Sequence, residues 1–300
     1  PNDRPKPTAI LAELGAKVVA THSTTLDRAE ARSLLGRDRE LSVMLHAYEA
    51  MRHGHPRMLL LRGRSGIGKS ALVAAFARLV QQRDRAVVLA GRCYEWETVP
   101  FKGLDGVVDA LSRHLGTIDP KILATLLPPN LSDLGTVFPV LRRHKPIAAA
   151  HARRSLVDRP PSTVRASAFA ALREVLARIA LRSPLVVVVD DVQWADADTA
   201  HALREIVGDA TAPPMLLVLA SRPKATGNNP VVDALFSDPE KATASEATPR
   251  ESATAILELG PLSEEATLDL VRRELGEAAS EELARLIVRE SGGNPFEAGE

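Results

Sequence analysis

The sequence has 300 residues, 45% of them hydrophobic and 25% charged, and 38 Lys and Arg residues balance 38 Asp and Glu residues. No overall charge therefore attracts nucleic acid or an anionic membrane, no apolar run approaches the ~20 residues that cross a bilayer, and we expect neither partner. Cys93 is the only cysteine, which excludes an intramolecular disulfide and favours a cytoplasmic location.

The N-terminal segment, residues 1–33, is predicted to be a tail with one short helix, closed by Gly15, and a linker. A longer helix is expected from Asp38 to near Gly54, because apolar residues recur there at helical spacing. The chain begins at Pro1 and ends within a helical pattern, so we expect a piece of a longer protein.

The segment from Gly63 to Ser70 fits the phosphate-loop pattern G-x-x-x-x-G-K-[ST] at every position. An apolar strand at Met58–Leu61 precedes it and a helical pattern follows it, which is the order that this chemistry requires. Lys69 is predicted to reach the β- and γ-phosphates as a catalytic residue, and the Ser70 hydroxyl to bind Mg²⁺. The nucleotide-binding residues predicted here are Gly63, Ser65, Gly66, Ile67, Gly68, Lys69, Ser70 and Ala71.

Strands and helices alternate after the loop. Further strands are expected at Ala86–Ala90, Leu185–Val189 and Met215–Leu219, with helices around 104–115, 169–179 and 199–207. This alternation predicts an α/β fold, the three-layer sandwich of a phosphate-loop NTPase with a parallel sheet. The ligand is expected at the carboxyl ends of the strands.

Three stretches depart from the alternation. Residues 120–161 show only short helical pieces and a basic patch made of Arg142, Arg143, Lys145, Arg153 and Arg154. We interpret this patch as a solvated, mobile loop, with an anion or nucleic-acid contact as the alternative, because no aromatic residues are interleaved for base stacking. Residues 223–252 are read as a flexible insertion, and residues 260–300 as the start of a helical lid subdomain with N-caps at Ser263 and Ser280.

Two acidic residues end the buried strand at Leu185–Val189. Asp190 is predicted to hold Mg²⁺, and Asp191 to orient or deprotonate an attacking water. A glutamate often fills the second position in vigorous ATPases, so the aspartate predicts slow hydrolysis. Arg222, at the tip of the strand Met215–Leu219, is predicted to sense the γ-phosphate in catalysis. A strand-end turn and a solvated arginine are the alternatives.

Three segments carry a resemblance to a known family: Leu35–Leu41, Asp190–Asp196 and Gly292–Phe296. With them, residues 34 to 300 resemble the signal-transduction ATPases with numerous domains (STAND), a branch of the AAA-like phosphate-loop fold. The resemblance implies ATP and Mg²⁺ as cofactors, Gly36 and Arg37 near the adenine, Arg222 as the first sensor, and Pro295 against the base. ATP or ADP, other domains of the same polypeptide and further copies in nucleotide-dependent self-association are the expected partners.

The N-terminal segment carries a second resemblance. Pro1–Pro5 and Ala9–Gly15 resemble the last helix region of a serine/threonine protein kinase, and Cys93–Phe101 is similar to ATPase modules fused to such kinases in bacterial signalling proteins. The sequence contains no glycine-rich kinase loop, no His-Arg-Asp and no Asp-Phe-Gly, so kinase activity is expected only in a part of the protein outside this sequence. An unstructured basic tail is the alternative.

Together these features predict an ATP-binding, slowly hydrolysing signal-transduction switch that follows a kinase domain. Its expected parts are residues 1–33, the ATPase core at 34–259 and the lid at 260–300. Three alternatives stay open: a non-hydrolysing scaffold, the ATPase module of a transcription regulator with a DNA-binding domain beyond residue 300, and a nucleotide kinase acting on a small molecule.

Overall fold

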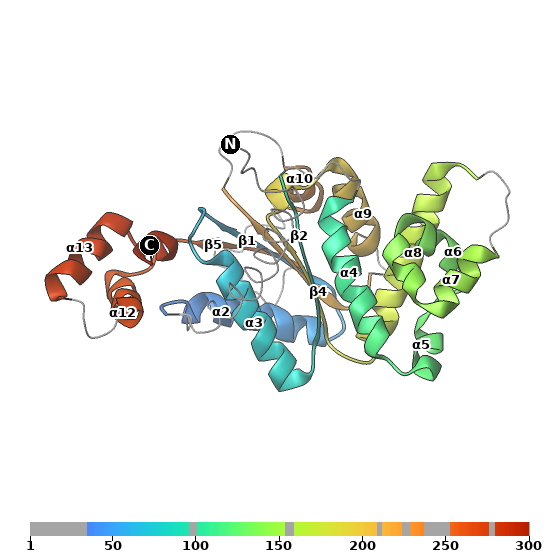
Figure 1. The fold of residues 1–300 in the computed structure, drawn as a ribbon, viewed down its shortest axis with the longest axis horizontal. Helices are drawn as coiled ribbons and strands as arrows, with labels where there is room; N and C mark the ends of the chain where they lie inside the picture. Colours follow the sequence, from blue (N-terminus) through green and yellow to red (C-terminus); the bar gives the residue numbers. More distant parts are fainter. Residues whose placement is uncertain are drawn as a thin grey trace, which may run out of the picture.

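The computed structural model describes residues 35–95, 101–153, 159–208, 212–223, 229–236, 253–275 and 280–299. Its centre is a five-stranded sheet in the order β2-β3-β4-β1-β5, in which every pairing is parallel. The strands are β1 (Arg57–Gly63), β2 (Val87–Arg92), β3 (Leu185–Asp190), β4 (Met215–Ser221) and β5 (Thr254–Leu259), seen together in Figure 1. The predicted α/β fold with a parallel sheet is confirmed.

Helices cover both faces of this sheet, so the apolar runs of β3 and β4 are buried on both sides. Alternate strand residues pack on α2 (Asp38–Arg52) and α3 (Lys69–Asp84) on one face. The other face packs on α4 (Lys102–Thr117), α8 (Pro161–Ala180), α9 (Ala197–Val207) and α10 (Pro230–Phe236). The result is the three-layer sandwich that the sequence predicts.

The expectation of a mobile loop within residues 120–161 is wrong for the residues described there. They fold into α5 (Pro120–Leu126), α6 (Leu131–Val137), the 3-10 helix η1 (Pro139–Arg143) and α7 (Lys145–Ala152), which Figure 1 shows beside α8. Leu134, Leu141 and Ile147 are fully buried and join the core. Helices of seven or eight residues are too short for a periodic pattern to be recognised. Arg154 lies outside the described residues.

The flexible insertion predicted at 223–252 does not hold for residues 230–236. They form α10, which buries Val231, Val232 and Phe236 against the core. Residues 224–228 and 237–252 lie outside the described residues. The strand β5, which follows, was not predicted; it adds to the edge of the sheet beside β1, with Met58 opposite Thr254.

The C-terminal helices α12 (Glu264–Leu275), α13 (Glu281–Ser291) and α14 (Pro295–Ala298) have an apolar cluster of their own. Ser280 caps α13 by accepting a hydrogen bond from Leu283 N, and Ser263 Oγ accepts one from Ala266 N at the start of α12. We call these three helices the lid. Residues 1–34, with the kinase-like segment, lie outside the described residues. No helix in the described ranges is long and apolar enough to span a membrane.

Candidate nucleotide-binding site

The phosphate loop joins the end of β1 to the start of α3. Gly66 and Gly68 adopt left-handed backbone angles, with φ of 76° and 98°, which an L side chain strongly disfavours. With glycine at these positions the loop can turn its backbone N–H groups towards one point at the N-terminus of α3. A helix N-terminus reached by such a loop is suited to bind a phosphate group.

Lys69 is the first residue of α3 and is only 7% exposed. Its Nζ donates hydrogen bonds to Gly63 O at 2.8 Å and Arg64 O at 2.9 Å. The ammonium group therefore links the end of the phosphate loop to its first two residues. Burial lowers the pKa of Lys69, whereas the carboxylates of Asp190 and Asp191 act to raise it. The side chain is therefore a buried cation held where phosphate oxygens would lie.

Ser70 and Asp190 lie together as the predicted magnesium site requires. Ser70 Oγ donates a hydrogen bond to Asp190 Oδ2 at 2.6 Å, and the backbone N–H of Asp191 fixes Asp190 Oδ1 at 2.8 Å. A hydroxyl and a carboxylate are the hard oxygen ligands that Mg²⁺ takes. In the described part of the chain no group of three or more His, Cys, Asp or Glu is placed to hold a metal, so Mg²⁺ here would also need phosphate oxygens and water.

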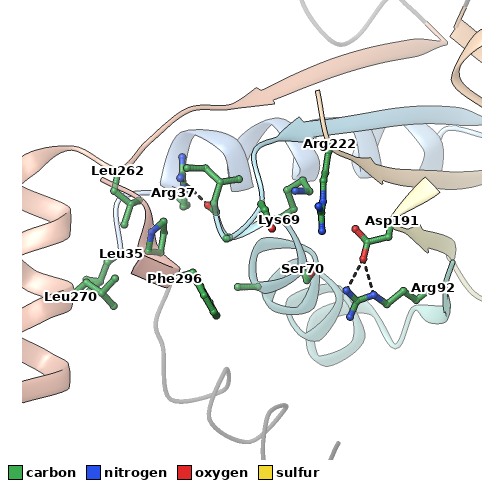
Figure 2. Close-up of a pocket in the computed structure, with 16 residues that line it drawn as sticks. Leu35, Arg37, Lys69, Ser70, Arg92, Asp191, Arg222, Leu262, Leu270 and Phe296 are labelled. Atoms are coloured by element: carbon green, nitrogen blue, oxygen red, sulfur yellow. Dashed lines mark hydrogen bonds and ion pairs between the residues drawn. The ribbon is translucent and has the colours of Figure 1, made fainter. Parts of the chain in front are cut away.

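Asp191 sits just beyond the end of β3 in a left-handed conformation, with φ of 54°. Arg92, at the end of β2, pairs with it: Arg92 Nη2 and Nε lie 2.6 and 2.8 Å from Asp191 Oδ2 (Figure 2). Gln193 Nε2 donates to the other oxygen, Oδ1, at 2.8 Å. Burial acts to lower the pKa of Arg92, but the hydrogen bond to Asp191 and the negative charges of Asp191 and Asp190 together outweigh it, so the pKa is raised. Both carboxylate oxygens of Asp191 are thus engaged.

Arg222 directly follows β4, and its side chain lies close to Lys69 and Asp191. Figure 2 shows its guanidinium near Lys69 and Asp191, and its charge contributes to the lowered pKa of Lys69. Its backbone N–H donates to Gln193 Oε1 at 3.2 Å, so the Gln193 side chain connects the ends of β3 and β4. The predicted sensor therefore lies among the residues that would surround a γ-phosphate.

A cavity of about 260 Å³ connects these groups. One end carries Lys69, Arg92 and Arg222, while the other is lined by the apolar residues Leu35, Leu262, Leu270 and Phe296. The remaining lining residues are Arg37, Ser65, Gly66, Ile67, Gly68, Ser70, Ala71, Asp191 and Pro295. A cationic end and an apolar end match the phosphates and the base of a nucleotide. Gly36, Gly63 and Asp190 are not among the lining residues.

The Gly36-Arg37 pair joins the lid to the loop. Gly36 has φ of 68°, and a Cβ there would lie 2.6 Å from Ala266 Cβ of α12. Buried Arg37 donates from Nη2 to Ile67 O at 3.1 Å and to Gly260 O at 2.7 Å. Arg37 therefore lines the cavity and also ties the phosphate loop to the segment that leads into the lid.

The lid touches the phosphate loop directly as well. Asn294 Nδ2 approaches Ser65 O at 3.4 Å, and a Cβ on Gly66 would lie 2.7 Å from Asn294 Oδ1. Asn294 also caps α14 by accepting from Phe296 N, which places Phe296 at the apolar end of the cavity. Pro295, predicted to contact the base, lies beside it.

Residues 33–219 match the family model described as the AAA ATPase domain, a span of more than half of the 300 residues. The chain belongs to this AAA ATPase domain family. The predicted AAA-like phosphate-loop ATPase is thereby confirmed. Members of this family are nucleotide-binding ATPase modules.

The relative and the solved structures named here share between 15% and 27% identity with this chain. It is 27% identical over 194 residues to an uncharacterized protein of Rhizobium meliloti (strain 1021), covering 63% of this chain and 18% of that protein. Similar solved structures include a STAND protein with a tetratricopeptide repeat sensor from Pyrococcus horikoshii, at 15% identity and a TM-score of 0.44, over 88% of this chain and 29% of that one. The Walker-type ATPase of Pyrococcus abyssi is 16% identical, with a TM-score of 0.48, over 88% and 65%. Cdc6p from Pyrobaculum aerophilum is 15% identical, with a TM-score of 0.46, over 86% and 55%.

Sequence reasoning missed several residues of the AAA domain's site, among them Arg92, Gln193 and Phe296 and the lining residues Leu35, Leu262 and Leu270. Arg92 is brought to Asp191 by the pairing of β2 with β3, in which Arg92 lies opposite Asp190. The order of strands in the sheet cannot be predicted from local sequence patterns. Arg92 nevertheless follows a predicted strand closely, and a cation at the carboxyl end of a parallel strand could have been considered as a site residue on that ground. Gln193 follows the acidic pair directly and could have been considered on that ground.

Proposed function

We propose that this AAA domain binds ATP with Mg²⁺ and hydrolyses it slowly, as the switch module of a multidomain cytoplasmic signalling protein. The observation that supports this best is the convergence of Lys69, Asp191 and Arg222, from three different elements, on one cavity whose far end is apolar. A glycine-rich turn that binds no ligand would not require charged side chains from three elements to meet at one cavity. The location rests on the single cysteine.

The chain's own groups suit phosphoryl transfer to water. Loop N–H groups and Lys69 bind the phosphates, and Ser70 with Asp190 would hold Mg²⁺, which when bound neutralises charge on the phosphate oxygens. Asp191 accepts a hydrogen bond from the attacking water and positions it. Arg222 balances the negative charge that develops on the transferred group.

Slow turnover follows from the environment of Asp191. Arg92 contacts its Oδ2 through both Nη2 and Nε, and Gln193 donates to its Oδ1, so few of the lone-pair positions of the carboxylate are left for an attacking water. A non-hydrolysing scaffold that binds ATP or ADP is the second candidate, and it is favoured by the same contacts. Measurement of phosphate release separates the two.

The switch itself would lie in the lid. In the lid, Asn294 contacts the phosphate loop, and Pro295 and Phe296 line the cavity. A bound nucleotide would therefore contact both the core and the lid. A ligand shifts a conformational equilibrium only by its differential affinity for the two states, and these contacts are where such a difference can arise. The resemblance to STAND ATPases supports nucleotide-dependent self-association, and the N-terminal resemblance supports a kinase domain in the same polypeptide.

The binding step is tested with Lys69→Ala in isothermal titration with ATP and magnesium. We expect binding to be lost and the circular dichroism spectrum to be kept, whereas Lys121→Ala, at an exposed lysine far from the site, binds as the parent does. Equal ATP affinity in Lys69→Ala would contradict the assignment.

The hydrolysis step is tested with Asp191→Asn. This variant should bind ATP yet lose phosphate release, while Asp198→Asn, an exposed aspartate in the first turn of α9, keeps both. Unchanged release in Asp191→Asn would show that Asp191 does not position the water. Binding without release in the parent protein would favour the scaffold.

A further inference from the structure

The region around α5, α6 and α7 is basic, although the whole sequence is neutral. In the described ranges 118–153 and 159–165, seven Lys and Arg residues stand against two Asp residues, a net charge of +5 with the histidines neutral. Figure 1 shows these helices at the end of the longest axis opposite the lid. The expectation of no nucleic-acid partner rested on the charge of the whole sequence, which conceals this local concentration of cations.

Both acids of the basic region are engaged elsewhere. Asp133 is only 2% exposed, and its Oδ2 accepts a hydrogen bond from Arg159 Nη1 at 2.6 Å. Asp119 caps α5 by accepting a hydrogen bond from Lys121 N at 2.8 Å. In the described part of the chain neither carboxylate pairs with a cation of η1 or α7. The positive charge of those two elements is therefore not neutralised from within the region.

Four cations of η1, of α7 and of the C-cap of α7 form what we call the basic surface: Arg142, Arg143, Lys145 and Arg153. All four side chains are exposed. Across the described ranges, none of them forms an ion pair with a carboxylate. Their charge is therefore available to a partner.

Buried residues hold this segment against the core. Leu141, His144 and Ile147 are buried at intervals of three residues, and His144 Nε2 lies 3.0 Å from Ser112 Oγ on α4. Because these positions are directed inward, the cations between them face the solvent. The basic surface is thus presented on backbone that the core fixes, and binding would require little ordering of the chain.

The two elements that carry the basic surface also pack on each other. Arg142 Nη1 lies 3.4 Å from His151 Nε2 in the last turn of α7. Gly135 of α6 permits this close packing, because a Cβ there would lie 3.1 Å from Ile147 Cγ2 and 3.3 Å from Arg142 Cγ. The cations before and after α7 therefore belong to one compact unit.

The composition of the basic surface favours the phosphates of a nucleic acid over an acidic protein. Residues 139–153 include no Phe, Trp or Tyr, and no exposed large apolar side chain lies in this stretch. Protein interfaces depend on aromatic and apolar anchors, and single-stranded nucleic acid on aromatic side chains that stack with bases. The phosphates of a duplex require only cations, and arginine contacts them in a bidentate geometry.

We propose that the basic surface binds duplex nucleic acid through its phosphates, irrespective of base sequence. Contacts to phosphates position a protein on a duplex but carry no sequence information. This inference goes beyond the proposed ATPase function, because the basic surface includes no residue that lines the nucleotide cavity. It assigns a binding role to a part of the fold that the ATPase reaction does not use.

The test is fluorescence anisotropy of a labelled DNA duplex, titrated with the 300-residue chain over a series of NaCl concentrations. Four phosphate contacts predict that the logarithm of the binding constant falls with the logarithm of salt concentration at a slope of about −3.6. Binding should therefore weaken on the order of 100-fold between about 50 and 200 mM NaCl. Arg142→Ala with Arg143→Ala should reduce the slope to about −1.8 and weaken binding at about 50 mM NaCl roughly tenfold or more.

Two control variants separate charge from packing and from general electrostatics. Arg142→Lys with Arg143→Lys keeps both charges and should keep the slope of the parent, which a purely structural role would not predict. Arg39→Ala with Arg204→Ala removes the same charge from exposed positions on α2 and α9, outside the basic surface, and should also keep it. No duplex binding by the parent, an unchanged slope in Arg142→Ala/Arg143→Ala, or an equal loss in Arg39→Ala/Arg204→Ala would each overturn the proposal. Circular dichroism melts check that every variant is folded.

An acidic protein segment is the competing occupant of the basic surface. If a poly-glutamate peptide of matched charge binds the parent more tightly than the duplex does, and Arg142→Ala/Arg143→Ala removes that binding, the surface serves an acidic protein and the proposal is wrong. ATP binding by all these variants should equal that of the parent, and Lys69→Ala should still bind the duplex. Failure of the nucleic-acid contact is therefore distinguishable from failure of the ATPase assignment.

Discussion

Arg92 and Asp191 form an ion pair between the ends of the neighbouring strands β2 and β3, with Arg92 Nη2 at 2.6 Å from Asp191 Oδ2. Because Gln193 engages Oδ1, the carboxylate that would hold the attacking water has no oxygen free of a donor. The same side chains that place Asp191 therefore also restrain it. If Asp191 positions the attacking water as proposed, we expect the rate of ATP hydrolysis to depend on how readily Arg92 releases it.

Removing Arg92 should accordingly speed basal hydrolysis. We expect Arg92→Ala to raise steady-state phosphate release at saturating ATP about threefold to tenfold, since Asp191 Oδ2 becomes free to accept a water. Arg92→Lys, which keeps a cation, should lie between the parent and Arg92→Ala. In an Asp191→Asn background the change should have no effect. A fall to the Asp191→Asn level would instead mean that Arg92 binds the phosphate.

Gly66 should tolerate no side chain. Its φ of 76° disfavours an L residue, and a Cβ would lie 2.7 Å from Asn294 Oδ1 and 2.8 Å from Phe296 Cβ. Gly66→Ala should weaken ATP affinity at least roughly tenfold while the fold persists, because both the loop and the lid contact are disturbed. Gly116→Ala is the control, since a Cβ there meets nothing closer than 3.9 Å. Parent-like affinity in Gly66→Ala would show that the loop can adapt.

Arg37 should matter for stability as well as for binding. Arg37→Ala leaves Ile67 O and Gly260 O without the donor that holds them, at a cost of about 1–3 kcal/mol in the free energy of unfolding. Arg37→Lys should recover only part of this, because a lysine lacks the planar fork that reaches both carbonyls. Urea denaturation measures the effect, with Arg39→Ala, at an exposed arginine, as the control. Equal stability of the Arg37→Ala and Arg39→Ala variants would show that the hydrogen bonds from Arg37 to Ile67 O and Gly260 O do not stabilise the fold.

The sequence predicted the parts of this site that depend on contiguous residues. The loop from Gly63 to Ser70 and the acids Asp190 and Asp191 each lie within a few residues of a strand, so local patterns were enough. Arg92 could not be assigned, because its role arises from the pairing of β2 with β3, a contact across 99 residues.

Two parts of the fold were also beyond local patterns. The short helices within 120–161 gain their stability from burial of side chains such as Leu141 and Ile147 in the common core, not from periodicity of their own. The edge strand β5 follows a stretch rich in Ala, Thr and Ser and is stabilised by pairing with β1. Tertiary context decides the structure in both places.

His144, between η1 and α7, makes the stability of the folded protein depend on pH. The side chain is buried, and its Nε2 lies 3.0 Å from Ser112 Oγ on α4. Burial lowers the pKa of His144 below its usual 6.5, and the charge of Arg143 acts in the same direction against the raising effect of the hydrogen bond. In the window below 6.5 the unfolded chain therefore binds more protons than the folded one, so stability rises with pH through this window and is lost as the pH falls.

His144→Gln should therefore flatten the dependence of the melting temperature on pH between about pH 7 and pH 5. Glutamine can still hydrogen-bond Ser112 Oγ but takes up no proton. The slope should not vanish, because burial also lowers the pKa of His114, and that residue contributes with the same sign. His46→Gln, at an exposed histidine, should leave the slope as it is in the parent. An unchanged slope in His144→Gln would mean that the site opens to water before the imidazole is protonated.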